Sequence, residues 1–446
     1  MRAMPKALQN TLLSLRELLL TAGPFVLLAV ALLAAAYGVL QPNPPRQVVL
    51  ATGVAQGAYA EFGKRYAELL AQHGITVTLR ATQGAAENLA LLRDPASGVD
   101  LGFVQGGADR PRDGDEAPES GLVSLGSVFY EPVWLFYRED SARRLLKGRP
   151  LDSLTQLAGW TLNVGAAGSG VPPLVDRLLE ANRIAPGTIQ LTRQPTTPAV
   201  VDLLEGRIDA LVLASAPESL MVQMLLQTPG IALFSFAQAE AYSRRFPFVS
   251  PVLLPRGVVD LARDLPPADV RLVAPTATLV ARQSLHPALV QLFVQAAQQV
   301  HGGPGWFQRK GDFPNAATIE RPLAAEAQRV YRSGPPWLPR YLPFWLANLA
   351  DRMWVVLLAI IAVLIPLARV VPPLYQFRIR RRVFRWYGQL REVEQAQGSR
   401  PAAALLGELD AIEAHVGQVS VPLSYADELY ALRSHIQMVR RRLQQA

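Results

Sequence analysis

Two long apolar runs lie near the two ends of the chain. Residues 18–40 span 23 positions without a charged side chain, and residues 353–368 span 16. A helix rises about 1.5 Å per residue, so the first run can cross a hydrocarbon core of about 30 Å. The second run is shorter, but Trp354 and Arg369 supply interfacial side chains near its ends. The pattern predicts transmembrane helices at 18–40 and 349–371.

Each run also has an alternative interpretation. The alanines at 34–36 would suit a signal peptidase, so the first run could be a cleaved signal peptide, although the apolar stretch of a signal peptide is usually only about 7–15 residues long. The second run could be a buried core helix.

Between the runs, short β-branched segments alternate with segments whose apolar residues recur at helical spacing. This alternation, over residues 46–333, is typical of α/β units on a largely parallel sheet. A helix, a turn, an aspartate and a buried strand follow one another at 91–104 and again at 201–212. The repeat predicts two lobes of related construction.

The chain is expected to cross between the lobes twice. The extended stretch 130–137 leaves lobe one, 246–254 returns from lobe two, and 274–285 restores the strand and helix pattern of lobe one. Two lobes joined in this way favour hinge closure on a ligand in the cleft between them.

The last part of the chain shows a different periodicity. Apolar residues recur three and four positions apart in two groups, which are Leu405, Leu409, Ile412, Val416 and then Leu429, Leu432, Ile436, Val439, Leu443. Such spacing predicts two helices with seams like those of coiled coils. The seams could close a hairpin that packs on itself, or they could bind a partner or a second copy through residues 402–446.

The composition agrees with a membrane protein that has a large folded part. Half of the residues are hydrophobic, 18% are charged and the mean hydropathy is +0.16, which excludes a disordered chain. The absence of cysteine excludes disulfides, thiolate zinc sites, iron–sulfur clusters and a cysteine nucleophile. An extracytoplasmic location remains compatible with this, because a core of this size is stable without disulfides.

The net charge of +8 lies almost entirely outside the predicted α/β part. Residues 1–17 carry +2, and residues 369–446 carry twelve arginines against seven acidic residues. The positive-inside rule therefore places both termini in the cytoplasm and the segment between the spans in the periplasm of a bacterial inner membrane. A nucleic-acid partner is not expected, because a binder would concentrate its charge on a folded face.

Together these patterns divide the chain into seven segments. In order they are a cytoplasmic amino terminus, a transmembrane helix, the first part of lobe one, lobe two, the second part of lobe one, a second transmembrane helix and a cytoplasmic helical tail. Their ranges are 1–17, 18–40, 46–137, 138–245, 246–333, 349–371 and 377–446.

Glycine-rich turns between predicted strands and helices mark the candidate ligand site. Three such turns contain Gly53 with Gly57, Gly84, and Gly168 with Gly170. Unpaired amides at a helix start bind anions, and ligands of open α/β sheets lie at the carboxyl ends of strands, so we expect these turns to converge there. The glycine spacing matches neither GxGxxG nor a P-loop, so nucleotide binding is not expected.

Other chemistry is not expected. Five histidines are scattered without a metal-ligand spacing, so we predict neither a metal site nor a cofactor. Ser169 lies in GSG rather than GxSxG, and it either caps the following helix or contacts a ligand oxygen. Asp100 and Asp209 precede buried strands, where turn or cap roles are expected rather than acid/base catalysis. We predict that the protein is not an enzyme.

Five motifs, in order between residues 46 and 333, resemble those of the TAXI family, the solute receptors associated with tripartite ATP-independent periplasmic (TRAP) transporters. The first motif, TGxxxGxYxxxG, is matched by Thr52, Gly53, Gly57, Tyr59 and Gly63. The others, TxGSxENLxLL, DxGxVQ, GxxGSGT and LxxGxIDA, resemble residues 82–92, 100–105, 165–171 and 203–210.

The resemblance implies a two-lobed periplasmic-binding-protein fold of type II, which is an α/β fold. It also implies that the side chains of Tyr59, Thr82, Asn88, Gln105 and Ser169 line the cleft and hold a small carboxylate, such as an amino or dicarboxylic acid.

The chain departs from the family pattern in its site and in its architecture. Ala85 and Ala86 stand where serine is usual, and Val171 replaces a threonine. Each hydrogen bond lost to a charged group would cost about 1.5–3 kcal/mol, enough to alter specificity. Family receptors are mostly secreted or tethered once, whereas this chain adds a second span and a tail.

The function expected from these observations is a membrane-anchored solute-binding protein that delivers its ligand to a TRAP-type permease. One alternative is a sensor, in which lobe closure shifts the spans and the cytoplasmic helices. A second alternative is a scaffold or assembly protein that has lost the ligand.

Overall fold

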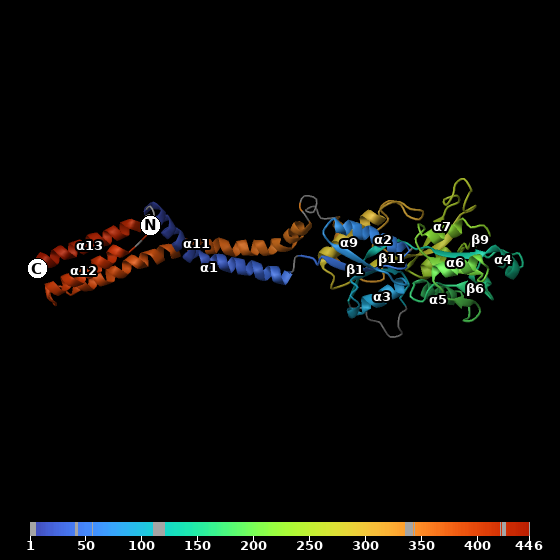
Figure 1. Ribbon diagram of the computed structural model, residues 1–446, viewed down its shortest axis with the longest axis horizontal. Helices are drawn as coiled ribbons and strands as arrows, with labels where there is room; N and C mark the ends of the chain where they lie inside the picture. The colour runs from blue at the N-terminus through green and yellow to red at the C-terminus, as the bar shows by residue number, and fades with distance from the viewer. Residues whose placement is uncertain are drawn as a thin grey trace, which may run out of the picture. The chain divides into compact units, whose positions relative to one another are not determined.

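A computed structural model describes residues 6–40, 43–55, 57–109, 121–334, 342, 344–419, 421 and 425–445 (Figure 1). The chain forms two compact units. One is Asn43–Asn348, called here the α/β unit, and the other combines Met1–Pro42 with Leu349–Ala446 and is called the helical unit.

The first sheet of the α/β unit has the order β10-β11-β3-β1-β2, with β4 also paired to β11. Strands β1, β2 and β3 are parallel, and β11 is antiparallel to β3, β4 and β10. The strands are β1 Gln47–Ala51, β2 Thr76–Arg80, β3 Leu101–Gln105, β4 Leu122–Tyr130, β10 Val249–Leu254 and β11 Val270–Arg282. The helices that belong with them are α2 Ala58–Ala71, α3 Ala85–Arg93, α9 Pro287–His301 and α10 Ala325–Ser333 (Figure 1).

The second sheet has the order β7-β6-β8-β5-β9. Its strands are β5 Val133–Arg138, β6 Thr161–Asn163, β7 Gln190–Thr192, β8 Ala210–Ala214 and β9 Ile231–Leu233. The helices of this lobe are α4 Glu139–Leu146, α5 Val171–Ala181, α6 Thr196–Leu204, α7 Leu220–Leu226 and α8 Ala239–Arg245. The predicted α/β class with two lobes is confirmed.

The two sheets repeat one construction. In each, a central strand pairs in parallel with two neighbours, and an antiparallel strand follows. The aspartates at the starts of β3 and β8 also correspond. The carboxylate of Asp100 accepts a 2.8 Å hydrogen bond from the N–H of Val49, and that of Asp209 accepts a 2.9 Å bond from the N–H of Thr161. Both aspartates therefore link neighbouring strands, whereas the sequence predicted turn or cap roles for them.

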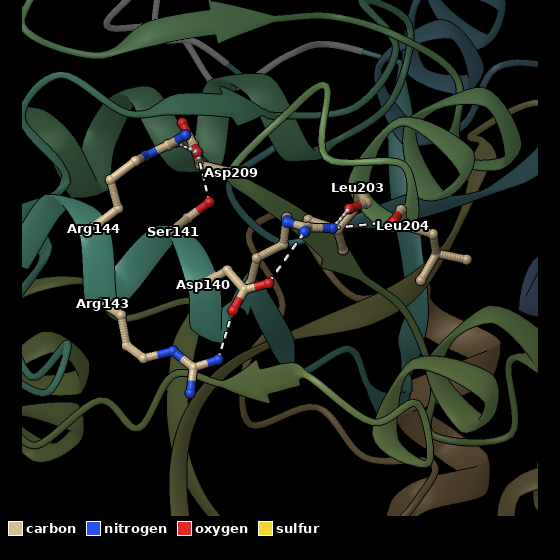
Figure 2. Close-up of polar contacts among 8 residues, drawn as sticks. Asp140, Ser141, Arg143, Arg144, Leu203, Leu204 and Asp209 are labelled. Atoms are coloured by element: carbon tan, nitrogen blue, oxygen red, sulfur yellow. Dashed lines mark hydrogen bonds and ion pairs between the residues drawn. The ribbon is translucent and has the colours of Figure 1, made fainter. Parts of the chain in front are cut away.

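Hydrogen bonds and ion pairs of charged side chains connect α4 with neighbouring segments of the second lobe (Figure 2). The guanidinium of Arg138 donates to the carbonyl oxygens of Leu203 and Leu204, each at 3.0 Å, which satisfies acceptors at the end of α6. Arg144 pairs with Asp209 at 2.7 Å. These contacts are structural and lie away from the cavity described below.

The crossings between the lobes differ from the prediction. Strand β5 was assigned to lobe one, but residues 133–137 pair with β8 of the second sheet. Residues 249–254 and 272–274 were assigned to lobe one as well, yet their buried side chains belong to the core of lobe two. The reason is the 13-residue strand β11, whose first half pairs with β10 and whose second half pairs with β3. The return to lobe one therefore falls near Pro275.

Two helices of the helical unit are long and apolar enough to cross a membrane. They are α1 Lys6–Leu40 and α11 Phe344–Gln395, with candidate spans at Leu19–Val39 and Met353–Gln395. Each predicted span therefore forms part of a longer helix. Only 6% of the most apolar window of α11 is buried, so the interpretation of the second run as a buried core helix is wrong.

The last turns of α11 pack with α12 Ala402–Gln418 and α13 Ala426–Gln445. The buried seams are Leu405, Leu409, Ile412 and Val416 on α12, and Leu432, Ile436, Val439 and Leu443 on α13. On α11 they meet Val383, Leu390 and Val393, and Arg442 pairs with Glu394 at 3.0 Å. This packing supports the predicted hairpin that packs on itself, because the seams are already covered within the chain.

Candidate ligand-binding site

A cavity of about 150 Å³ lies in the α/β unit, with walls from both lobes. Lobe one contributes the turns that follow β1 and β2 and the last residue of β3, and lobe two contributes the turn after β6, the start of α6 and the end of β8. A cavity of this size holds a molecule about as large as benzene. The carboxyl ends of parallel strands in both sheets meet here, which is where ligands of open α/β sheets bind.

Four helices begin at the cavity wall without a side-chain cap. They are α2, α3, α5 and α6, and their N-cap residues are Gly57, Gly84, Gly170 and Pro195. None of these residues has a side chain that can accept from the first-turn amides. The starts of four helices therefore line one small space and favour a negatively charged group there, with α5 contributing the fewest amides because Pro172 and Pro173 have no N–H.

Gln105, the last residue of β3, lies in the wall of this space. The side chain is 3% exposed, and its Nε2 amide has no hydrogen-bond partner among the described residues. A Cβ on Gly170 would lie 2.2 Å from Oε1 of Gln105, so glycine at position 170 lets the two loops approach. A buried donor without a partner is costly, so this amide is a candidate to bind a ligand acceptor once a ligand displaces the side chains around it.

Tyr59 and Glu131 form a buried pair in the cavity wall. The hydroxyl of Tyr59 donates to Oε2 of Glu131 at 2.8 Å, and Glu131 is 3% exposed. Burial raises the pKa of Glu131 to about 8, although the bond from Tyr59 opposes this, and burial also raises the pKa of Tyr59. Glu131 is therefore mostly uncharged at pH 7.

Glu131 was not predicted as a site residue from the sequence. The available signal was one acidic residue inside the apolar stretch of residues 128–136. The residue also lies at the first crossing between the lobes, where its N–H donates to the carbonyl of Pro275, at the second crossing, at 2.8 Å.

Ser169 does not cap a helix. The N-cap of α5 is Gly170, and the hydroxyl of Ser169 donates to the carbonyl of Ala166 at 2.7 Å. The capping interpretation is therefore wrong. The same loop touches lobe one, because the N–H of Glu87 donates to the carbonyl of Gly168 at 3.1 Å and a Cβ on Gly84 would lie 3.2 Å from Cα of Ser169. The two lobes thus meet beside the cavity.

Seven of the ten residues singled out in the sequence lie in the cavity wall. They are Gly53, Gly57, Tyr59, Gly84, Gln105, Ser169 and Gly170. Thr82, Asn88 and Gly168 are not in the wall. Asn88 is fully buried, accepts from the Thr82 hydroxyl at 2.6 Å and donates to the Phe103 carbonyl at 2.8 Å. Thr82 and Asn88 therefore hold the turns in place from behind.

The positions where the chain departs from the TAXI pattern lie in the wall as well. Ala85 and Val171 both line the cavity and are both buried. The wall contains no Lys, Arg, His or Asp side chain among the described residues. In the described ranges, no three His, Asp or Glu side chains are placed to hold a metal ion.

The two-lobed fold, with a cavity walled by both lobes, is that of a solute-binding domain. The model of the NMT1-like family matches residues 50–299, so the chain belongs to that family. No curated protein matches the chain.

Several solved structures are similar at low identity. A putative L-cystine ABC transporter from Listeria monocytogenes is 13% identical, with 57% of this chain and 90% of that chain covered and a TM-score of 0.36. The CcmR regulatory domain of Synechocystis PCC6803 in complex with 2-PG is 14% identical, with coverages of 58% and 98% and a TM-score of 0.37. A periplasmic transporter is 13% identical, with coverages of 65% and 94% and a TM-score of 0.38.

Proposed function

We propose that the α/β unit is the receptor for a small carboxylic acid and that its two lobes close over this ligand. The observation that carries the proposal is that four helices without a side-chain cap begin at one cavity, whose wall also includes Gln105, a residue with a buried Nε2 that has no partner among the described residues. The residues proposed to contact the ligand are Gly53, Gly57, Tyr59, Gly84, Gln105, Ser169 and Gly170.

A carboxylate fits this cavity on energetic grounds. With no basic side chain in the described wall, the helix N-termini supply the positive potential, each contributing about 0.3–1 kcal/mol. Hydrogen bonds from amides to a charged acceptor add about 1.5–3 kcal/mol each. The volume of about 150 Å³ is enough for about six non-hydrogen atoms, as in alanine or lactate, and because the cavity is partly open to solvent, larger acids such as glutamate are tested as well.

The proposed cellular setting is the periplasmic face of a bacterial inner membrane. In it α1 and α11 span the bilayer, and the arginines after the second span, Arg378, Arg380, Arg381, Arg382 and Arg385, hold both termini in the cytoplasm. A reporter enzyme that is active only in the periplasm, fused after Ala446, should be inactive. Activity at that position would contradict the two-span arrangement.

Within this setting the first candidate output is uptake, with the receptor passing its ligand to a TRAP-type permease, as the TAXI resemblance implies. The test is binding of L-alanine, L-lactate, L-glutamate and succinate to the full chain in detergent, followed by uptake of any acid that binds into cells with and without the gene. If an acid binds and its uptake is lost in the deletion strain, the result supports a receptor for uptake. If none of these acids binds, both the uptake receptor and the ligand sensor are excluded, and a scaffold or assembly role is left.

One observation favours a second candidate, a ligand sensor. Helix α11 is 52 residues long and continues without a break from its apolar segment into the bundle formed with α12 and α13. A displacement of the apolar segment would therefore be carried into the bundle. Removal of residues 396–446 separates the two outputs: uptake that survives supports transport alone, and a lost ligand response with intact binding supports the sensor.

A further inference from the structure

We infer that Glu131 binds the ammonium group of an α-amino acid in this cavity and releases its own proton to solvent when it does so. The inference rests on the proposed function and specifies it further. It makes ligand binding a proton-releasing step, and it assigns to Glu131 the discrimination between amino acids and other small acids.

The geometry leaves one oxygen of Glu131 open to a ligand. Oε2 accepts the hydroxyl hydrogen of Tyr59 at 2.8 Å, and among the described residues no donor reaches Oε1. The side chain lines the same cavity as the N-termini of α2, α3, α5 and α6. The carboxylate of an amino acid bound at those N-termini would leave its ammonium group inside the cavity, where Glu131 is the only acidic side chain of the described wall.

The groups around Glu131 carry no compensating charge. Helix α2 presents Tyr59, whose ring stacks on Phe103 of β3 at 5.0 Å between centroids. Strand β4 contributes Phe129, and His301 of α9 stacks beyond it at 5.3 Å. Burial lowers the pKa of His301 to about 3, so this ring is neutral at pH 7. An ionised Glu131 therefore lacks a cation in the empty cavity, and a ligand ammonium supplies one.

The proton balance distinguishes three ligand classes. For an amino acid, the O–H bond of Glu131 breaks, its proton goes to the buffer, and the ligand enters as a zwitterion with all its N–H bonds intact. A hydroxy acid requires no change at Glu131, and a second carboxylate requires Glu131 to stay protonated. With a pKa of about 8 in the empty cavity, close to 0.9 proton should leave per amino acid bound at pH 7.

The test compares acids that differ only in an ammonium or a hydroxyl group. The full chain in detergent is titrated calorimetrically at pH 7 with L-alanine and L-lactate, and with L-glutamate and L-2-hydroxyglutarate, in phosphate and in Tris. The two buffers have different ionisation heats, so the difference between the observed heats counts the protons released. We expect about 0.9 proton for an amino acid and none for its hydroxy analogue.

The pH dependence and one variant complete the test. Amino acid affinity should rise about tenfold from pH 6 to pH 7 and level off above pH 8. Glu131→Gln keeps the shape and an acceptor for Tyr59 but cannot ionise, so at pH 8.5 it should bind the amino acid roughly tenfold to hundredfold more weakly and release no proton. The exposed Glu68→Gln on α2 serves as the matched control.

The outcomes separate this inference from the proposed function. Equal binding of amino and hydroxy acids without proton release, or unchanged proton release in Glu131→Gln, overturns the role of Glu131 while the carboxylate receptor stands. Binding of none of the four acids overturns the receptor and the inference together.

Discussion

Replacing Glu131 by glutamine should stabilise the empty α/β unit, by an amount that grows with pH. The carboxyl is 3% exposed and has a pKa of about 8 in the folded chain, against an ordinary value of 4.5. When the pKa of an acid is higher in the folded than in the unfolded state, its contribution to the free energy of unfolding is full below the unfolded-state pKa. That contribution is lost as the pH rises from the unfolded-state pKa to the folded-state pKa. The native protein should therefore lose stability between about pH 4.5 and pH 8.

The magnitude follows from the two pKa values. Each pKa unit of difference between the two states corresponds to about 1.36 kcal/mol. Ionisation of this carboxyl therefore stabilises the unfolded state relative to the folded state by about 3 kcal/mol at pH 7 and by about 5 kcal/mol near pH 9. Glutamine cannot ionise in either state and still accepts from Tyr59. The free energy of unfolding of the variant minus that of the native chain should therefore be larger by these amounts at pH 7 and pH 9 than at pH 4.

The assay is thermal unfolding of the full chain in detergent at pH 4, 7 and 9 without ligand. For a unit of this size, 1 kcal/mol moves the melting temperature by roughly 2 °C, so the melting temperature of the variant minus that of the native chain should be about 6 °C larger at pH 7 than at pH 4. Glu68→Gln, on the exposed face of α2, should show no such trend. A constant difference between Glu131→Gln and the native chain across this pH range would refute the buried neutral carboxyl.

Three further outcomes are expected. As the pH falls from 8 to 5, the free energy of unfolding of His301→Phe should rise by about 2 kcal/mol relative to that of the native chain, because the native chain is destabilised when the pH falls below the unfolded-state pKa of a histidine whose folded-state pKa is lowered. Equal acid denaturation of the two chains would contradict this. Gly170→Ala should displace the Gln105 amide and weaken ligand binding at least tenfold, while Gly407→Ala, which meets open space on α12, should bind normally. Asp209→Asn should lower the free energy of unfolding by roughly 1–3 kcal/mol in chemical denaturation without changing affinity, and altered affinity would contradict its structural role.

Local patterns were sufficient for most of the fold. The strand at 76–80 and the strand and helix patterns around Asp100 and Asp209 could be predicted because β-branched runs, turn residues and helical periodicity are properties of short segments. The lobe boundary at residue 137 was wrong because the pairing of β5 with β8 joins residues more than 70 positions apart, and sequence alone does not fix which sheet an extended stretch enters.

The site was only partly predictable for a related reason. Glycine turns and Gln105 carry their signal in the segment itself, since they follow a strand and precede a helix or turn. Glu131 acquires its raised pKa from burial in the folded chain, and its partners Tyr59 and Pro275 are 72 and 144 residues away, so its local sequence gives no sign of this environment. The tail illustrates the same limit, because the seams of α12 and α13 were visible in the sequence, but the part of α11 that covers them, although it falls within the predicted tail 377–446, was not predicted as a third helix of the bundle.

The most direct test of the central claim is equilibrium binding of radiolabelled L-glutamate and L-alanine to the full chain in detergent, with Gly170→Ala and Gly407→Ala measured in parallel. We predict saturable binding of at least one of these acids at one site per chain, retained in Gly407→Ala and weakened at least tenfold in Gly170→Ala. The absence of saturable binding, or equal affinity in both variants, would contradict a carboxylate receptor built on this cavity.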